Sequence, residues 1–570
     1  AVIRKYDQDE NVTNKKIINY DWDNNEVREK RTPNSAERRY QKTLSKNFTL
    51  YADYKKNFND RHDLSVMVGT SHESENYDRF TAKRINFDQQ ENMSLQLGSA
   101  QDQNAWSEGN QWTINSFFSR VNYTFANKYV IEGTIRADGS SRFDPDHRWG
   151  WFPGVNAAWR VGEEGFMKRL GWFEDLKVRA SYGEMGNQSG IGLYDYIQLI
   201  SLSNDYYPFG AGMKGQMATS GNIISTSRTW ETIQTTNVGF DFSTLNNRLY
   251  GSFDYFWKEN KNMLIPKTYP SMLGADAPST NSGHLSIHGW EISLGWRDQI
   301  KDFSYSVRFN ISDAKNKVVD RVGSNLIKLG NNETPTGYPL NSYFGYEFDG
   351  IIQNEQELEA YKSRFSEGGI PGDLSVGDAM YKDLDGDGKL SVLGDGKEGS
   401  GDVKYLGDKN PRYNFGFNLS MAWKGFDLSA FIQGVGRRTM FLEGESRCPM
   451  PEAWYQSAEY WYGKTWTPER TDAQYPAITL KDKRNYNYYV STNTKFNVAY
   501  ARLKNLQFGY TIPQTLTSKA GLQKVRVYFS GEDLFEVHNT PNGWDPEENS
   551  GSITSYPFTR NYSFGINVVF

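Results

Sequence analysis

The residues best suited to chemistry are a group of closely spaced aspartates. Asp383, Asp385 and Asp387 occupy positions 1, 3 and 5 of a loop whose sixth residue is glycine and whose seventh is Lys389. Calcium loops place carboxylates at positions 1, 3 and 5, a glycine at 6 and a backbone carbonyl at 7. Position 12, usually a carboxylate, is glycine here, and Asp395 follows it. We expect these residues to hold one structural Ca²⁺ or Mg²⁺ in the loop 383–395; the alternative is an acidic turn in solvent.

Catalytic motifs are absent from the sequence. Its six histidines include no HExxH pair, and no GxSxG elbow occurs. His284 and His288 lie four residues apart on one face of an expected strand, so a two-histidine metal site is a weaker alternative. The GxGxxG strings at 210–215 and 394–399 do not join a strand to a helix, so they indicate turns. We expect no enzymatic activity and no organic cofactor.

Aromatic residues are dense in the segments 185–232 and 441–499. Exposed aromatic patches usually mark interaction sites, so we expect these residues to contact a ligand or an external partner. The alternatives are an interfacial aromatic girdle and packing within the loops. The residues are Tyr194, Tyr196, Tyr206, Tyr207, Trp454, Tyr455, Trp461, Tyr462, Trp466, Tyr486, Tyr488 and Tyr489.

The elements that position these residues are strands. At the end of the chain, Tyr562, Phe564, Ile566, Val568 and Phe570 alternate with small or polar residues. A period of two with one apolar face predicts a β-strand. The same pattern fills 411–424 and 426–440, so these two segments predict a hairpin with strands of about 10 residues or more, long enough to cross a bilayer when tilted.

The pattern recurs along the whole chain. Expected strands cover 46–56, 62–73, 114–125, 128–138, 150–161, 173–184, 233–244, 247–259, 285–298, 301–315, 411–424, 426–440, 500–511, 523–534 and 558–570, with a weaker sixteenth near 13–20. Short turns alternate with long polar connections, which cover 74–113, 185–232, 316–410, 441–499 and 535–557. Outer-membrane barrels show this asymmetry, with periplasmic turns and extracellular loops. The pattern predicts an all-β, transmembrane antiparallel β-barrel with long extracellular loops and a periplasmic C-terminus.

Composition agrees with a membrane barrel. Aromatic residues make up 15% of the chain, and the mean hydropathy is −0.72. No apolar run approaches the roughly 18 residues of a membrane-spanning helix, whereas barrel strands are polar on average. A net charge of −5 gives no reason to expect nucleic acid, and Cys448 is the single cysteine, which excludes an internal disulfide. A soluble propeller is the alternative, but we find no repeat at the blade period of about 40–50 residues.

Several short segments form a recognisable series along most of the chain. They are Arg120–Tyr123, Arg136–Phe143, Phe152–Pro153, Ala158–Arg160, Trp230–Glu231, Thr236–Asp241, Asp254–Tyr255, Gly289–Glu291, Pro371–Asp373, Asp383–Gly388, Trp466–Glu469, Arg502–Leu506, Gly509–Tyr510, Arg526–Tyr528 and Asp533–Phe535. In their sequence and order, these segments resemble the SusC/RagA family of TonB-dependent outer-membrane transporters of Bacteroidota. One departure is Ile287-His288, where the family usually has Asn-Lys.

The resemblance implies a 22-strand barrel of which residues 1–570 carry roughly the last 16 strands. We then expect the N-terminal plug and the first strands to lie outside this sequence, which opens without a signal peptide. It also implies import of a nutrient, most often an oligosaccharide or a peptide, with a SusD-like surface lipoprotein and with TonB acting through the absent plug. The alternative is a transporter-like barrel that serves as a structural or assembly subunit of a larger outer-membrane complex.

Overall fold

The structure is a computed structural model that describes most of the chain. The described residues are 16–21, 26–31, 34–87, 94–101, 103–203, 217–221, 223–266, 272, 278–321, 329–330, 334–393, 401–451, 457–479, 482–548, 551 and 558–570.

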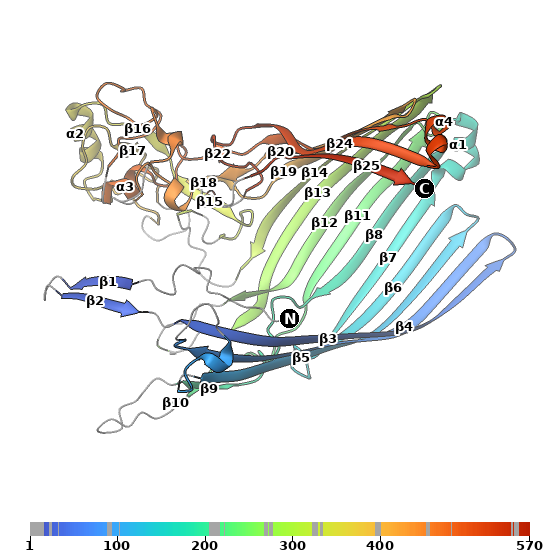
Figure 1. Ribbon diagram of the computed structural model, residues 1–570, viewed down its shortest axis with the longest axis horizontal. Coiled ribbons are helices and arrows are strands. Elements are labelled where there is room, and N and C mark those ends of the chain that lie inside the picture. The colour runs from blue at the N-terminus through green and yellow to red at the C-terminus, as the bar shows by residue number, and fades with distance from the viewer. Residues whose placement is uncertain are drawn as a thin grey trace.

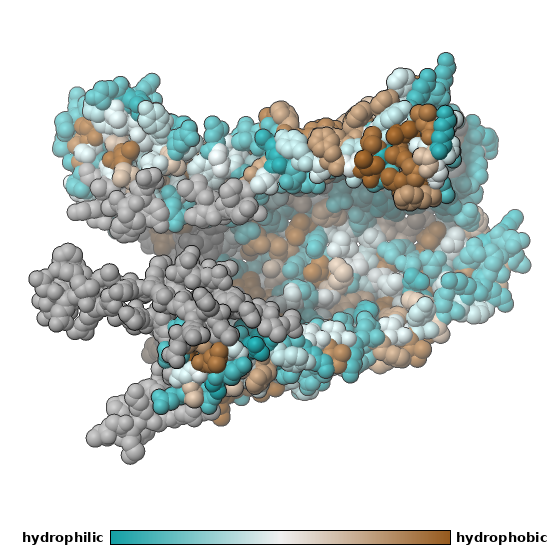
Figure 2. Space-filling model, viewed as in Figure 1, coloured by the Kyte–Doolittle hydropathy of each residue, from teal (hydrophilic) through white to brown (hydrophobic). Residues whose placement is uncertain are grey.

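One antiparallel sheet of fifteen strands dominates the molecule. Its strands are β3 (Ser35–Phe58), β4 (His62–Ile85), β5 (Gln103–Phe125), β6 (Tyr129–Ser140), β7 (Trp149–Arg160), β8 (Asp175–Asn187), β11 (Glu231–Thr244), β12 (Leu249–Pro266), β13 (Ser279–Ile300), β14 (Phe303–Asp320), β19 (Arg412–Trp423), β20 (Phe426–Arg437), β23 (Tyr500–Thr511), β24 (Lys524–His538) and β25 (Asn561–Val569). Each strand pairs with the one before and after it in this order, and β3 and β25 form the edges. The sheet is strongly curved (Figure 1), and the space-filling view shows that its concave side is hollowed (Figure 2). An all-β sheet of the barrel kind is thereby confirmed.

All fifteen clearly patterned segments of the sequence lie in this sheet. The weaker sixteenth does not. It is found as β1 (Lys16–Asp21), which pairs only with β2 (Glu26–Arg31) in a separate two-stranded sheet. With six residues, β1 is shorter than the roughly 9–11 that a tilted strand needs to cross a bilayer. The expectation of a sixteenth barrel strand here was therefore wrong.

The two faces of the sheet differ in chemistry. On β25, the side chains of Tyr562, Phe564 and Ile566 share one face by strand alternation and are 63%, 83% and 67% exposed. Figure 2 shows a hydrophobic patch near the end of this strand. On the other face, Arg179 lies 2.5 Å from Asp254 and 3.2 Å from Asp241. An apolar outer face and a polar inner face are the arrangement of a barrel in lipid.

Short turns join the strands at one end of the sheet. Ala126–Asn127 and Lys424–Gly425 have positive φ at both residues, as the tightest hairpin turns require. Two connections at this end are longer and form small helices: η2 (Val161–Glu163) with α1 (Gly165–Leu170), and α4 (Gln514–Thr517) with η6 (Ser518–Ala520). The C-terminus lies at the same end (Figure 1).

Three strands are much longer than the sequence pattern indicated. β3, β4 and β5 have 24, 24 and 23 residues, so most of the expected loop 74–113 is paired strand, capped by η1 (Leu95–Leu97). A bilayer needs only about 9–11 tilted residues per strand. The outer parts of these strands therefore extend beyond the bilayer, where neither face of the sheet has to be apolar. Because their sequence is polar on both faces, the alternating pattern did not predict them as strands.

The long connections gather at the opposite end. The one between β14 and β19 forms β15 (Ser342–Tyr346), β16 (Phe348–Ile351), α2 (Glu355–Arg364), β17 (Ala379–Tyr381) and β18 (Val403–Asp408). The one between β20 and β23 forms β21 (Thr439–Met440), η4 (Gly444–Ser446), η5 (Glu459–Trp461), α3 (Asp482–Asn487) and β22 (Phe496–Asn497). A third, between β8 and β11, contains β9 (Ile200–Ser203) and β10 (Met217–Ser220). Among the described residues, no helix has both the length and the apolar character needed to span a membrane.

Candidate functional site: the loop cap and its acidic pocket

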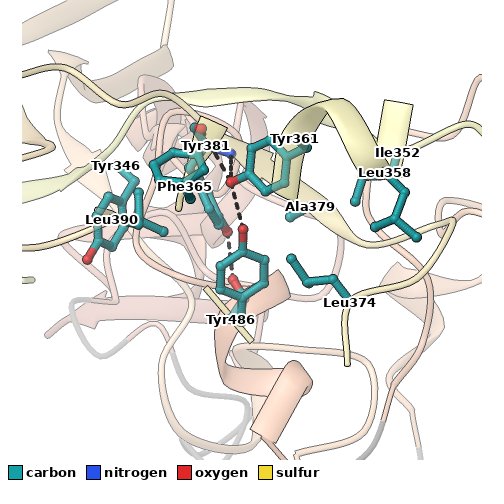
Figure 3. Close-up of a cluster of buried hydrophobic side chains, with 10 residues drawn as sticks. All are labelled: Tyr346, Ile352, Leu358, Tyr361, Phe365, Leu374, Ala379, Tyr381, Leu390 and Tyr486. Carbon is teal, nitrogen blue, oxygen red and sulfur yellow. Dashed lines mark hydrogen bonds between the residues drawn. The ribbon is translucent and has the colours of Figure 1, made fainter. Parts of the chain in front are cut away.

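The connections β14–β19 and β20–β23 fold into one body, which we call the cap. Its described residues are 321, 329–330, 334–393, 401–411, 438–451, 457–479 and 482–499. Figure 3 shows its core, in which Tyr346, Tyr361 and Tyr381 of the first connection pack with Tyr486 of the second. The two long loops are therefore one packed unit and not two independent segments.

Hydrogen bonds through this core join the two connections. The Tyr361 and Tyr486 hydroxyls lie 2.7 Å apart, and the Tyr381 hydroxyl donates to the Tyr486 carbonyl at 2.8 Å. Asn487 adds two bonds, because its amide donates to Asp378 at 2.9 Å and its oxygen accepts from the Ala379 amide at 2.9 Å. Burial raises the pKa of Tyr361 to about 12. These tyrosines therefore stay neutral and hold the cap together through packing and hydrogen bonds.

The acidic loop follows β17 within this cap. Asp383 accepts hydrogen bonds from the amides of Gly386 at 2.6 Å and Gly388 at 3.0 Å, and both glycines have positive φ, at +74° and +75°. Asp385 accepts from the Gly401 amide at 2.7 Å. The expected turn geometry is present, and it brings two of the predicted carboxylates together.

A residue that the sequence did not single out completes the group. Oxygens of Asp383, Asp385 and Asp402 all lie within 4.8 Å of one another. Asp402 is fully buried, and its carboxylate accepts hydrogen bonds from the amides of Leu384 at 2.6 Å and Ser391 at 2.8 Å. Burial, together with the charges of Asp385 and Asp383, raises the pKa of Asp402. A cation between these carboxylates would relieve that cost.

The donor set fits a hard cation better than the sequence alone indicated. All three groups are carboxylates, and their spacing suits an ion bonded to oxygen at roughly 2.3–2.6 Å. Asp387 lies outside the group and accepts instead from the Lys389 amide at 2.8 Å. Asp395, expected to close the loop, lies outside the described residues. Asp402 supplies a third carboxylate that the sequence analysis did not single out.

Eight of the twelve predicted aromatic residues are described, and these eight fall into three groups. Trp461, Tyr486 and Tyr488 are at most 3% exposed and pack inside the cap, where they stabilise it and present no surface. Tyr194 and Tyr462 are exposed, the latter by 90%. The partly buried members are Tyr196, Trp466 and Tyr489. The remaining four, Tyr206, Tyr207, Trp454 and Tyr455, lie outside the described residues.

In the part of the chain that the structure describes, neither His284 nor His288 belongs to a group of three or more candidate metal ligands. His284 Nε2 lies 2.6 Å from a carboxylate oxygen of Glu259, whose other oxygen accepts from Ser286 at 2.7 Å. His284 therefore has an acidic partner in place of a second imidazole.

Arg502 carries a buried charge, and the sequence pattern did not predict that this residue is buried. Its guanidinium is fully buried and lies within 2.5 Å of Glu536, 2.6 Å of Asp545 and 3.2 Å of Glu547. Buried charges need such compensation. This network fixes the connection after β24 to the sheet and gives a structural reason for an arginine in the segment Arg502–Leu506.

Comparison with known proteins identifies the family to which this architecture belongs. The profile of the family described as "TonB dependent receptor-like, beta-barrel" matches residues 4–534. TonB-dependent receptor P3 of Formosa agariphila is 31% identical over 93% of this chain and 52% of its own length. TonB-dependent receptor SusC of Bacteroides thetaiotaomicron is 26% identical over 92% of this chain and 50% of its own. The chain thus spans about half the length of the curated relatives it matches.

Solved structures agree on the fold. The structure of the RagAB peptide transporter superposes with a TM-score of 0.78 at 23% identity, covering 94% of this chain and 56% of that one. The RagAB peptide importer in its "open-open" state gives 0.76 at 23% identity with the same coverage. The fifteen-stranded sheet and its cap therefore follow a known architecture.

Proposed function

Because the chain belongs to the family of TonB-dependent receptor-like β-barrels, in its SusC/RagA branch, we propose that it forms the barrel of an outer-membrane importer. The barrel admits a nutrient from outside, and TonB supplies the energy. The observation that carries this proposal is the sheet, whose outer face suits lipid and whose long connections fold into a cap at one end.

The orientation in the membrane follows from the same asymmetry. Barrels of this kind place short turns in the periplasm and long loops outside the cell. We therefore place the cap on the cell surface, and the C-terminus and α4 in the periplasm. In this position the cap stands where a cargo first meets the protein.

The cargo and partner are part of the proposal. We infer that the cargo is an oligosaccharide or a peptide and that a SusD-like surface lipoprotein covers the cap. The similarity to SusC and to the RagAB peptide transporter supports this inference. The exposed ring of Tyr462 is one candidate contact for the lipoprotein.

Uptake in the native bacterium tests the function. Deletion of the complete gene is expected to abolish growth on one oligosaccharide or peptide and to leave growth on glucose unchanged, and a strain lacking TonB activity should show the same defect. Complementation with the intact gene is the control. Unchanged uptake of every cargo, together with loss of a larger complex from the outer membrane, would contradict import and support the assembly-subunit function.

We also propose that Asp383, Asp385 and Asp402 bind one Ca²⁺ or Mg²⁺ in a structural role. Asp402 lies beside β18 and the other two follow β17, so an ion would tie these two parts of the cap together. The ion would neutralise the buried charge of Asp402 and stiffen the loop 383–393.

A further inference from the structure

Two rows of exposed aromatic side chains mark the limits of the apolar band on the outer face of β3–β7. Residues that pair across these strands share a face, and the pairings run without a register shift. The row beside the short turns consists of Phe58, Phe125, Tyr129 and Trp159, and the second row consists of Phe48, Phe117, Trp149 and Trp151. Barrels place such rows at the two surfaces of the bilayer. The second row therefore marks the extracellular surface in the orientation proposed above.

A line of cations on β3 begins directly above the second row. The strand forms one edge of the sheet, beside β4 and β5 (Figure 1). Alternate residues share a face, so the outer-face residues beyond Phe48 include Lys46, Lys42 and Arg38, all of them exposed. We call these three cations the basic line. With a rise of about 3.4 Å per residue, the basic line runs for about 27 Å away from the membrane surface.

Cations on the two faces of these strands differ in their partners. On the inner face, Arg79 of β4 forms an ion pair with Glu108 of β5 at 2.6 Å. On the outer face, no residue of the basic line makes an ion pair with any residue that the structure describes. The basic line therefore has its charge available for an anionic partner from outside the chain.

The other charges on this part of the outer face leave it net positive. β4 contributes Asp78, which lies opposite Lys42 in the register, and Arg84, whose guanidinium donates to the Gly98 carbonyl at 3.2 Å. On β5, the outer-face residues within 103–115 carry no charge. Four cations therefore share this surface with one carboxylate.

Apolar side chains lie between the cations. Leu44 and Tyr40 separate them along β3, and Phe80 of β4 lies opposite Tyr40; these side chains are 41%, 55% and 48% exposed. A free anion needs no apolar surface, and a single phosphate is too small to contact both ends of the basic line. The alternation suits an extended, amphipathic molecule that carries several anionic groups.

We propose that the basic line binds the phosphorylated head group of a glycolipid in the outer leaflet of the membrane. Its phosphates would pair with Lys46 and Lys42, its sugar rings would contact Leu44 and Tyr40, and its acyl chains would lie against the apolar band below Phe48. A lipid is favoured over a soluble anion because the basic line starts at the bilayer surface. The inference rests on the proposed membrane orientation and does not depend on the cargo.

Lipid binding by the purified full-length protein tests the proposal. The probe is deep-rough lipopolysaccharide, titrated in detergent and followed by native mass spectrometry. Lys42→Gln combined with Lys46→Gln should weaken binding at least about tenfold, because each cation near an anionic lipid surface contributes on the order of a fivefold factor. Removing the phosphates from the lipid should weaken its binding to the wild type to a similar extent.

The matched control removes the same charge from the inner face of the same hairpin. Lys55→Gln combined with Lys83→Gln changes one inner-face lysine on β3 and one on β4, and this variant should bind the lipid as the wild type does. Heat-modifiable migration of each variant checks that its barrel is folded. Millimolar inorganic phosphate should leave the bound lipid in place.

Labelling in cells tests the orientation separately. Lys42→Cys should react with a membrane-impermeant maleimide in intact cells, whereas Lys519→Cys, in η6, should react only after the cells are broken. Reversed labelling would overturn the orientation and the lipid site together. Import, which deletion of the gene tests, stands or falls separately.

Three results would overturn the lipid site alone while the labelling stays as expected. The first is equal affinity of the outer-face variant and the inner-face control. The second is equal affinity of the wild type for phosphorylated and dephosphorylated lipid. The third is displacement of the lipid by millimolar phosphate, which would show a site for a free anion.

Discussion

The hydroxyl oxygens of Tyr361 and Tyr486 lie 2.7 Å apart, although 125 residues separate them in the chain. Two strands of the sheet, β19 and β20, intervene. The contact is buried, and each ring belongs to a different long connection. Because of this contact, we expect the two connections to form or lose their structure together.

Removing the Tyr486 side chain should separate the two connections. Tyr486→Ala leaves a cavity and should cost the docked cap about 3–5 kcal/mol, whereas Tyr486→Phe loses one hydrogen bond, about 1 kcal/mol. Hydrogen exchange of residues 355–364 and 379–381 measures the effect. Equal protection in the alanine variant and the wild type would show that the connections are independent.

Trp461 and Tyr462 offer a matched pair of adjacent residues. Trp461 is 3% exposed and Tyr462 is 90% exposed, so Trp461→Ala should destabilise the cap by about 3–5 kcal/mol and Tyr462→Ala should leave it unchanged. Proteolysis of the folded barrel compares them. Tyr462→Ala is instead expected to weaken capture of the surface lipoprotein in a pull-down; unchanged capture would remove Tyr462 from that interface.

Alkaline pH should loosen the cap. Burial raises the pKa of Tyr361 to about 12, while an unfolded tyrosine ionises near about 10. Between these values the unfolded state binds fewer protons than the folded one, so stability falls as pH rises. As the pH is raised, tyrosinate absorbance should show a step at high pH that coincides with the loss of hydrogen-exchange protection in α2. The step should shrink in Tyr361→Phe but not in the control Tyr462→Phe.

The proposed cation site makes a prediction of its own. Chelation should increase cleavage within 383–393, and Ca²⁺ should restore protection. Asp402→Asn should make cleavage insensitive to the chelator and to Ca²⁺, because this substitution removes the buried negative charge that an ion would neutralise. Asp387→Asn, whose carboxylate lies outside the group, is the control and should keep the response. A wild-type cleavage pattern that ignores chelator and Ca²⁺ would exclude a structural ion.

The strands were predictable from sequence because lipid imposes a strict rule on them. Tyr562, Phe564 and Ile566 must share a face, so the period of two is visible without any tertiary information. Beyond the bilayer the rule no longer applies. The outer half of β3 carries charge on both faces, and nothing in residues 35–45 distinguishes paired strand from loop.

The candidate sites were only partly predictable, for a related reason. Asp383 and Asp385 are local neighbours, and their spacing was informative. Asp402 reaches them only because the chain returns through the start of β18. Likewise, Trp461 and Tyr462 have similar side chains in one loop, and only the packing around them decides which is core and which is surface.

In the membrane orientation proposed above, the length of β3, β4 and β5 has a consequence for the exterior of the cell. A protease must draw an unpaired, extended segment into its active site, but the backbone from Ser35 to Lys46 is hydrogen-bonded in register to β4. This part of the protein should resist surface digestion that would remove a loop of equal length. An antibody raised against the corresponding linear peptide should fail to recognise intact cells, because the native epitope is a rigid, pleated ribbon.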